Sequence, residues 1–230
     1  YGVIFAVLAN DIRRLLAYHI ISQVGYMVAG VGMGTALALN GSVSHAFSHI
    51  LYKSLLFMGA GAVLHMTGKS KLTDLGGLYK TMPITLTLYM IGGLSISAFP
   101  LFSGFVSKSM IVTAAAEEHL TIIWLILSVS SAGTFLHTGL KLPYFTFLGK
   151  DSGLRVKEPP INMLIAMGIS SFACILIGVY PNVLYNLLPF GASYTPYTGE
   201  HIVWTMQILL FTALGFFLLL KHLDGEPYIT

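Results

Sequence analysis

The stretch His45-Ala46-Phe47-Ser48-His49-Ile50-Leu51-Tyr52-Lys53 lies inside an apolar run that extends from about Ser42 to His65. His45, His49 and Lys53 are four residues apart, so on an α-helix they lie on one face, about 6 Å apart per step. A run of this length can cross a bilayer, because a membrane helix needs about 20 apolar residues. A charge near the centre of a bilayer costs roughly 3 kcal/mol or more and is normally kept for an ion path. The stretch therefore predicts a membrane helix that carries a stripe of protonatable groups.

The composition indicates an integral membrane protein. Hydrophobic residues make up 55% of the 230-residue chain, charged residues only 9%, and the mean hydropathy is +0.79. A soluble domain has charge on roughly a quarter of its residues. The formal net charge of +3 is too small to indicate a nucleic-acid partner. We expect the lipid bilayer to be the main surroundings of the chain.

Six apolar runs are long enough to cross a bilayer, and no segment alternates polar and apolar residues with the period of a strand. The sequence thus predicts an all-α, polytopic transmembrane helical bundle of about six spans. Residues 1–9 resemble the tail of a further span. The six runs lie at about 16–39, 42–65, 82–116, 120–148, 160–184 and 203–220.

The ends of the sequence indicate an internal piece of a longer protein. The chain begins Tyr1-Gly2 without a Met or the charged start of a signal peptide, and it stops at Thr230 without an evident end signal. We expect residues 1–230 to form a single transmembrane domain.

The charged residues of the loops predict the topology. With six spans the connections alternate between two sides, and one side has no Lys or Arg, only Glu117, Glu118, His119, Glu200 and His201. The positive-inside rule then places the Lys/Arg-rich loops in the cytoplasm. The basic loop residues are Arg13, Arg14, Lys69, Lys71, Lys80, Lys150, Arg155, Lys157 and Lys221. Three lysines remain inside the spans: Lys53, Lys108 and Lys141.

The run 82–116 is too long for one straight crossing and is interrupted in the middle. Pro100 removes a backbone donor and clashes with the preceding turn, and we expect Gly104 to loosen the chain again. The pattern predicts a broken helix that faces a polar cavity, with Lys108 one to two turns beyond the break.

Two further groups are candidates with competing explanations. His137 and Lys141 form another pair four residues apart, and Lys141 is near enough to the cytoplasmic surface for its amine to reach the interface instead. His19 begins a span close to Arg13 and Arg14, and its role stays open. Outside the spans, Asp11 is placed to cap the helix that follows it.

Metal and cofactor chemistry find little support in the sequence. Histidines four residues apart can bind zinc, but no Asp, Glu or Cys is near His45 and His49, and Lys53 would repel a cation. The single cysteine, Cys174, excludes a disulfide within the chain or a Cys-based site, and no dinucleotide motif is present. We expect no metal, no cofactor and no catalytic residue. The spans also hold no carboxylate to modulate the lysines, so we expect an acidic partner from outside this sequence.

Several short motifs together resemble a known family. They are Asp11-Ile12-Arg13-Arg14-Leu15-Leu16-Ala17-Tyr18, Gln23-Val24-Gly25-Tyr26, His45-Ala46-Phe47, Lys53-Ser54-Leu55-Leu56-Phe57, Leu75-Gly76-Gly77-Leu78, and Phe99-Pro100-Leu101-Phe102-Ser103-Gly104-Phe105 followed by Lys108. The chain resembles the second half of the antiporter-like membrane subunit shared by Mrp-type Na⁺/H⁺ antiporters, respiratory complex I and membrane-bound hydrogenases. The resemblance covers almost the whole chain.

The resemblance implies a role for each candidate residue. The family contains two inverted repeats of five helices, each with a broken helix and a half-channel, and this chain would be the second repeat. Lys53 would carry protons at the midplane, His45 and His49 would connect to it, and Lys108 would exchange protons with the outer side. His19 stands where the family usually has a small hydroxyl residue, and the acidic partner in the first repeat is absent from this sequence.

We therefore expect a proton-translocating subunit of a multisubunit complex in a prokaryotic inner membrane, with Na⁺ as a candidate second ion. The segments 134–137, 141–144 and 194–197 look most like the D-type subunit of Mrp antiporters or a close hydrogenase-linked relative. Three alternatives remain: a proton-pumping subunit of an NADH:quinone oxidoreductase or membrane-bound hydrogenase, a structural subunit that transports nothing, and a membrane enzyme with a histidine-bound metal. The chain would not be catalytic by itself in the first of these.

Overall fold

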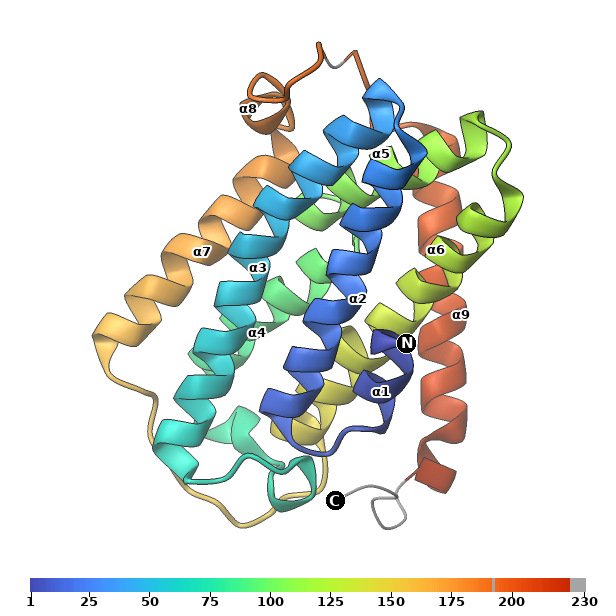
Figure 1. Cartoon of the computed structure of the whole chain (residues 1–230). Coiled ribbons are helices and arrows are strands. Elements are labelled where there is room, and N and C mark those ends of the chain that lie inside the picture. Colours follow the sequence, from blue (N-terminus) through green and yellow to red (C-terminus); the bar gives the residue numbers. More distant parts are fainter. Residues whose placement is uncertain (192, 224–230) are drawn as a thin grey trace.

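The computed structural model describes residues 1–191 and 193–223, with side chains up to Leu220, and every element in this part of the chain is helical (Figure 1). The predicted all-α bundle is thus confirmed. The α-helices are α1 (Gly2–Leu8), α2 (Ile12–Met33), α3 (Ala36–Thr67), α4 (Pro83–Ile96), α5 (Ser103–Glu117), α6 (Thr121–Thr134), α7 (Ile161–Val179), α8 (Asn182–Tyr185) and α9 (Gly199–Leu223). Short 3₁₀ turns, η1 (Leu72–Asp74) and η2 (Leu78–Lys80), follow α3, and π-helical segments, η3 (Phe135–Lys141) and η4 (Tyr144–Leu148), continue α6.

Five of these helical segments are long and apolar enough to cross a membrane, by length and composition. They are α2, α3, the continuous stretch Thr121–Leu148, α7 and α9. The predicted broken helix in the run 82–116 corresponds to the pair α4 and α5, which would together make a sixth crossing. The helices therefore fit an integral membrane protein.

Local caps fix where α2 begins and ends. The Asp11 side chain accepts hydrogen bonds from the amides of Arg13 and Arg14, at 2.9 and 3.1 Å, as expected for the N-cap of α2. Gly34 ends the helix in the left-handed region at φ 73°, where a side chain would be strained. These caps place the tight α2–α3 turn directly after Met33.

The centre of the bundle is α3, which packs against α2, α4, α5 and α7 (Figure 1). α1 lies against α2, α6 and η3, and α9 packs against α6 and η3 as well. Helix α3 is thus the element around which the polar side chains of the other helices can gather.

The break between α4 and α5 is built by close backbone contact. Ala98 and Leu101 have φ of 60° and 74°, so the chain passes through left-handed conformations on both sides of Pro100 before α5 begins. A Cβ on Gly104 would lie 1.8 Å from the carbonyl oxygen of Ser95. The glycine therefore lets the backbone of α5 approach that of α4 at the break.

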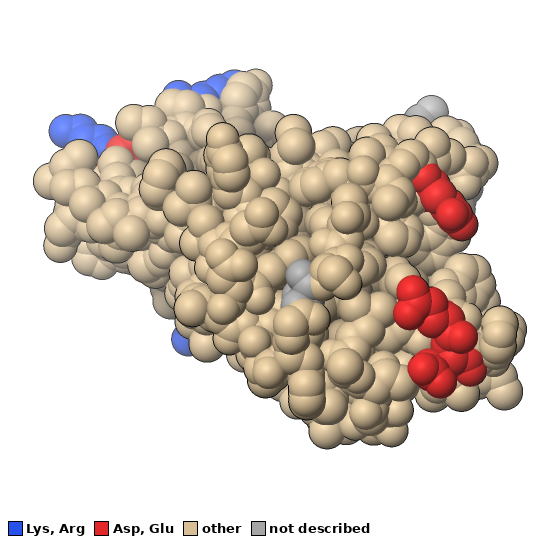
Figure 2. Space-filling model, turned by 90° about the horizontal axis from the view of Figure 1, so that it is seen from above, with Lys and Arg blue, Asp and Glu red and all other residues tan. Residues whose placement is uncertain are grey.

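The charged residues separate to the two ends of the bundle. The described basic loop residues lie at the end where α2 begins and α3 ends, and there Asp151 bonds Lys80 and Arg155, each at 2.9 Å. Seen from the other end, acidic residues form the visible charged patches and Lys or Arg appears only at the rim (Figure 2). The exposed acids of that end are Glu117, Glu118 and Glu200. The side chain of Lys221 lies outside the described residues.

Candidate functional site

The histidine and lysine stripe of α3 faces the interior of the bundle and not the lipid. His45 is 0% exposed, His49 9% and Lys53 5%, whereas neighbouring apolar residues such as Ile50 are 66% exposed. Lys53 lies near the middle of the 32-residue helix, and His45 lies toward the acidic end. The predicted stripe is therefore buried, and His45, His49, Lys53 and the Lys108 of α5 are called the polar axis below.

His45 is held on both ring nitrogens. Its Nδ1 hydrogen-bonds the Ser107 hydroxyl of α5 at 3.0 Å, and its Nε2 hydrogen-bonds Oε1 of Gln23 in α2 at 3.2 Å. The Tyr52 hydroxyl lies 3.4 Å from the same Nε2. Gln23 in turn donates to the Thr134 hydroxyl of α6 at 3.3 Å. One imidazole thus joins four helices at the centre of the bundle.

Lys53 lies beside a pair of histidines from other elements, and its amine contacts one of them. Its amine lies 3.2 Å from Nδ1 of His19 in α2, and the His19 ring packs edge-on against His137 of η3 with ring centroids 4.8 Å apart. His137 is fully buried. The structure therefore brings His19 and His137 into contact beside Lys53, a grouping that the spacing along the chain does not reveal.

Lys108 lies in the second half of the broken helix, as predicted, and its amine binds a backbone carbonyl that the break leaves free. Its amine donates to the carbonyl oxygen of Ile96 at 2.7 Å, a group that the interruption of α4 leaves without a helical partner. The amine also lies 5.2 Å from the centre of the Tyr26 ring, which is 5.8 Å from the His45 ring. Lys108 is thereby linked to His45 through Tyr26, and through its chain neighbour Ser107.

Lys141 has a partner that the sequence does not suggest. Its amine donates to the carbonyl oxygens of Val7 and Ala9, at 2.5 and 2.8 Å, where α1 ends. A cation at the carboxyl end of a helix satisfies free carbonyls and complements the helix dipole. In this structure the Lys141 amine therefore caps the carboxyl end of α1.

Three buried ring nitrogens near Lys53 and the polar axis have no hydrogen-bond partner among the described residues: Nε2 of His19, His49 and His137. Buried polar atoms are nearly always hydrogen-bonded, to protein or to ordered water. We therefore expect water molecules beside these rings, which fits a path along which protons can move.

The remaining polar contacts of the site come from residues that the sequence reasoning did not select. In the sequence, Gln23 and Tyr26 stand out only as members of the motif Gln23-Val24-Gly25-Tyr26, and no pattern marks Ser107. A usable signal was present for two of them, since Gln23 follows His19 by four residues and Tyr26 follows Gln23 by three, so all three share a helix face.

Among the described residues, the site has neither a cluster of metal ligands nor a carboxylate paired with its lysines. No group of three or more His, Cys, Asp or Glu side chains in the described part of the chain could hold a metal ion. Both nitrogens of His45 already have protein partners. Within the same residues, the ion pairs lie at the basic end of the bundle, at Asp11 and Asp151, and none includes Lys53 or Lys108.

Comparisons with known proteins agree with this arrangement. Residues 1–134 match the family model described as "NADH:quinone oxidoreductase/Mrp antiporter, TM". An uncharacterized protein of Methanocaldococcus jannaschii is 37% identical over 193 residues, covering 82% of this chain and 40% of that protein. The D-type subunit of a Na⁺/H⁺ antiporter from Alkalihalophilus pseudofirmus is 39% identical over 152 residues, covering 66% of this chain and 30% of that protein. The chain thus spans well under half the length of these relatives.

A solved structure shares the fold along the whole chain. In the membrane-bound sulfane sulfur reductase, an archaeal respiratory membrane complex, one chain superposes with a TM-score of 0.78 at 30% identity. The match covers 100% of this chain and 40% of that chain.

Proposed function

Because the chain belongs to the NADH:quinone oxidoreductase/Mrp antiporter transmembrane family, we propose that it is a proton-translocating, antiporter-like subunit of a multisubunit membrane complex. Residues 1–230 would form one transmembrane domain, the second of two inverted repeats in a longer subunit. The complex would lie in a prokaryotic inner membrane, with the Lys/Arg-rich loops in the cytoplasm according to the positive-inside rule. Its other membrane subunits and the bilayer would be the partners of this chain.

The observation that carries the proposal is the burial of two lysines in the middle of an apolar bundle. Lys53 is 5% exposed and Lys108 3% exposed, and neither has a carboxylate partner among the described residues. Such groups are costly inside a membrane and typically belong to ion or proton paths. Their histidine neighbours, His19, His45 and His49, can accept and release protons.

The contacts suggest an order for the path. From the basic end, protons would reach Lys53 past His137 and His19, continue along His49 and His45, and leave through Lys108. The ring centroids of His45 and His49 are 6.4 Å apart, a gap that one bridging water can span. The freed carbonyl of Ile96 would hold the Lys108 amine in place between transfers.

Among the members of this family, we favour a protein like the D-type subunit of the Mrp Na⁺/H⁺ antiporter, so that proton movement is exchanged for Na⁺. The 39% identity to the A. pseudofirmus protein supports this choice. A second candidate is a proton-pumping subunit of a redox-driven complex, since one chain of the membrane-bound sulfane sulfur reductase, a respiratory membrane complex, matches this chain along its whole length.

The test replaces Lys53 by Ala in the complete complex, reconstituted into liposomes that contain a pH-sensitive dye. We expect ion-driven proton movement to fall to the background of empty liposomes, because the central carrier is lost, while the subunits still purify together. The matched control is Lys157→Ala, which removes an exposed loop lysine and should transport like the wild type.

Wild-type transport by an intact Lys53→Ala complex would contradict the proposal and favour a purely structural subunit. Stoichiometric metal in the purified complex that disappears on replacing His45 and His49 would instead favour the metal enzyme.

A further inference from the structure

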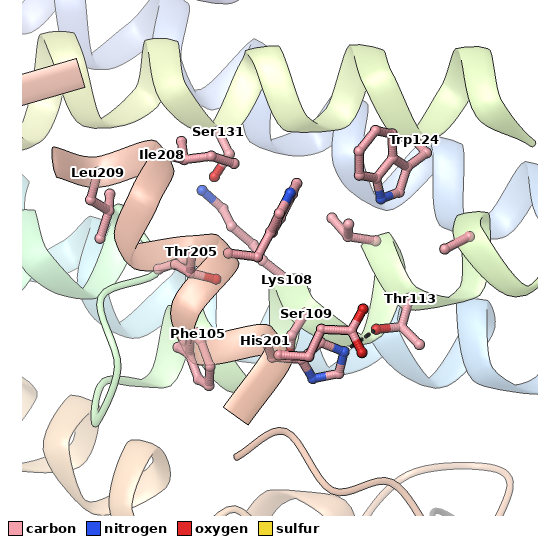
Figure 3. Close-up of a pocket in the computed structure, with 15 residues that line it drawn as sticks. Phe105, Lys108, Ser109, Thr113, Trp124, Ser131, His201, Thr205, Ile208 and Leu209 are labelled. Carbon is pink, nitrogen blue, oxygen red and sulfur yellow. Dashed lines mark hydrogen bonds between the residues drawn. The ribbon is translucent and has the colours of Figure 1, made fainter. Parts of the chain in front are cut away.

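A cavity of about 280 Å³ lies between α5, α6 and α9 and reaches Lys108 from the acidic end of the bundle (Figure 3). We call this cavity the vestibule. Its volume is far more than the roughly 10–15 Å³ that one water molecule needs, so it can hold several waters. In Figure 3 the Lys108 side chain extends toward Ser131 on one side of the vestibule, while His201 and Thr113 lie on the other.

The wall of the vestibule combines apolar rings with a few polar groups. Phe105, Trp124 and Trp204 line it, together with the hydroxyls of Ser109 and Thr205. A low-dielectric wall of this kind concentrates the field of any charge that it encloses. The two ionisable groups besides Lys108 are Glu200 and His201, at the start of α9.

His201 is positioned by residues from two neighbouring segments. Its Nε2 lies 3.2 Å from the Thr113 hydroxyl of α5, and its Nδ1 lies 3.2 Å from the carbonyl oxygen of Pro196. The Tyr194 hydroxyl lies 3.1 Å from the same Thr113 hydroxyl. These contacts hold the first turn of α9 against α5, so that the exposed Glu200 stands where the vestibule meets the acidic surface.

We propose that the vestibule is filled with water and that Glu200, in the helix turn that His201 fastens to α5, is the carboxylate through which Lys108 exchanges protons with the acidic side. The sequence predicts a carboxylate from outside the chain, whereas Glu200 belongs to α9 of the chain itself. In one transfer, an N–H proton of the Lys108 ammonium passes along the vestibule waters to the Glu200 carboxylate, leaving a neutral amine and a carboxylic acid. The acid then releases the proton to bulk water. The role of Glu200 in proton exchange rests on the proposed function, whereas the hydrated vestibule does not.

The first experiment probes the vestibule without any need for transport. Thr205→Cys is introduced in the full complex, and the rates of its reaction with a cationic and an anionic membrane-impermeant methanethiosulfonate are measured in vesicles of both orientations. The chain's own cysteine, Cys174, is buried and gives the background. We expect labelling from one side only, and Glu200→Gln should lower the cation-to-anion rate ratio by roughly threefold or more, because a full negative charge near the thiol is lost.

The matched control is Glu118→Gln, which removes an exposed acid of the same end that does not line the vestibule and should leave the ratio unchanged. Ser109→Cys serves as a second probe if Thr205→Cys does not assemble. No labelling at either position would mean that lipid chains fill the vestibule. Equal cation-to-anion rate ratios in Glu200→Gln and Glu118→Gln would mean that Glu200 does not set the charge selectivity of the vestibule. Either result overturns the proposal.

The second experiment measures transport in the same reconstituted system. Glu200→Gln should slow proton movement by about tenfold and Glu118→Gln should not change it, whereas equal rates in the two variants would overturn the role of Glu200. Lys53→Ala should abolish transport yet keep the wild-type labelling pattern at Thr205→Cys. Normal labelling together with wild-type transport in Lys53→Ala would reject the proposed function and leave the hydrated vestibule supported.

Discussion

At the residue scale, the broken helix depends on one missing side chain and one buried amine. Gly104 lets the backbone of α5 approach the Ser95 carbonyl, and the serine hydroxyls of Ser95 and Ser103 bond across the break at 3.0 Å. Lys108 then supplies a donor for the Ile96 carbonyl. The cation is therefore part of the local fold as well as of the proposed path.

Gly104→Ala should destabilise the protein. The new methyl group would overlap backbone atoms of α4 that cannot move independently, and overpacking of this kind costs roughly 1–3 kcal/mol. The thermal denaturation midpoint of the purified complex in detergent is the measurement. Gly168→Ala in α7, where nothing lies within 4 Å of the added Cβ, is the control and should change the midpoint little. Equal midpoints for the two variants would contradict the close contact.

The sequence predicts single helices better than it predicts which residues of different helices meet. Hydropathy and Pro100 are local signals, and they predict the spans and the break; the spacing of His45, His49 and Lys53 predicts their shared face. The contact of Lys53 with His19 joins residues 34 positions apart, and that of Lys141 with Val7 joins residues 134 apart. Such contacts depend on how each helix is rotated in the bundle, which no local pattern specifies.

At the element scale, α1 is fastened to the bundle through its carboxyl end. The π-helical turn of η3 carries Lys141 toward α1, where the amine donates to two carbonyls. A π-helical turn inserts an extra residue and redirects the side chains that follow, which explains how Lys141 can point inward so close to the basic end.

Lys141→Ala should loosen α1. Two carbonyls would lose a charged donor, and leaving buried groups without partners costs roughly 1–3 kcal/mol each. Hydrogen exchange of the α1 amides should speed up while that of α7 stays constant. Lys69→Ala, in an exposed loop at the same end, should leave both unchanged, and unchanged exchange in Lys141→Ala would argue against the cap.

Two carboxylates attach the loop between η4 and α7: Glu158 accepts hydrogen bonds from the Ile84 amide and the Thr85 hydroxyl, and Asp151 binds basic residues. Hydrogen bonds from Arg155, Lys80 and the Gly153 amide hold the pKa of the Asp151 carboxyl below its usual range. A lowered pKa in the folded state means that the ionised carboxylate stabilises the fold at every pH above about 3.9, its value in the unfolded chain. This contribution is lost as the pH falls toward the lower folded-state pKa.

Asp151→Asn should therefore lower the denaturation midpoint at pH 6 to 8, and the difference from the wild type should shrink once the pH falls below about 3.9. Added salt should reduce the difference as well, because the group is exposed. Asp74→Asn is the control, since Asp74 is in the same region and takes part in none of the ion pairs described. A difference that does not vary with pH would rule out this explanation.

At the scale of the whole molecule, the fold separates three kinds of surface. Exposed apolar residues cover the flanks of α2, α7 and α9, the described basic loops gather at one end, and the acids Glu117, Glu118 and Glu200 gather at the other (Figure 2). The polar axis lies between the two charged ends, and the vestibule extends from Lys108 toward the acidic one. The three surfaces together would orient the proposed path across the bilayer.

Because Lys53 lies near the middle of α3, the electrical work of moving a proton across the membrane would be divided between the two sides of this residue. Moving one elementary charge across a membrane potential of 100 mV takes about 2.3 kcal/mol. A proton that reaches the centre of α3 from either end has crossed about half of the membrane, and thus about half of that work lies on each side of Lys53. An applied voltage would then change the rate at which protons reach Lys53 and the rate at which they leave it by similar factors. Both halves of the proposed path would therefore respond to the membrane potential.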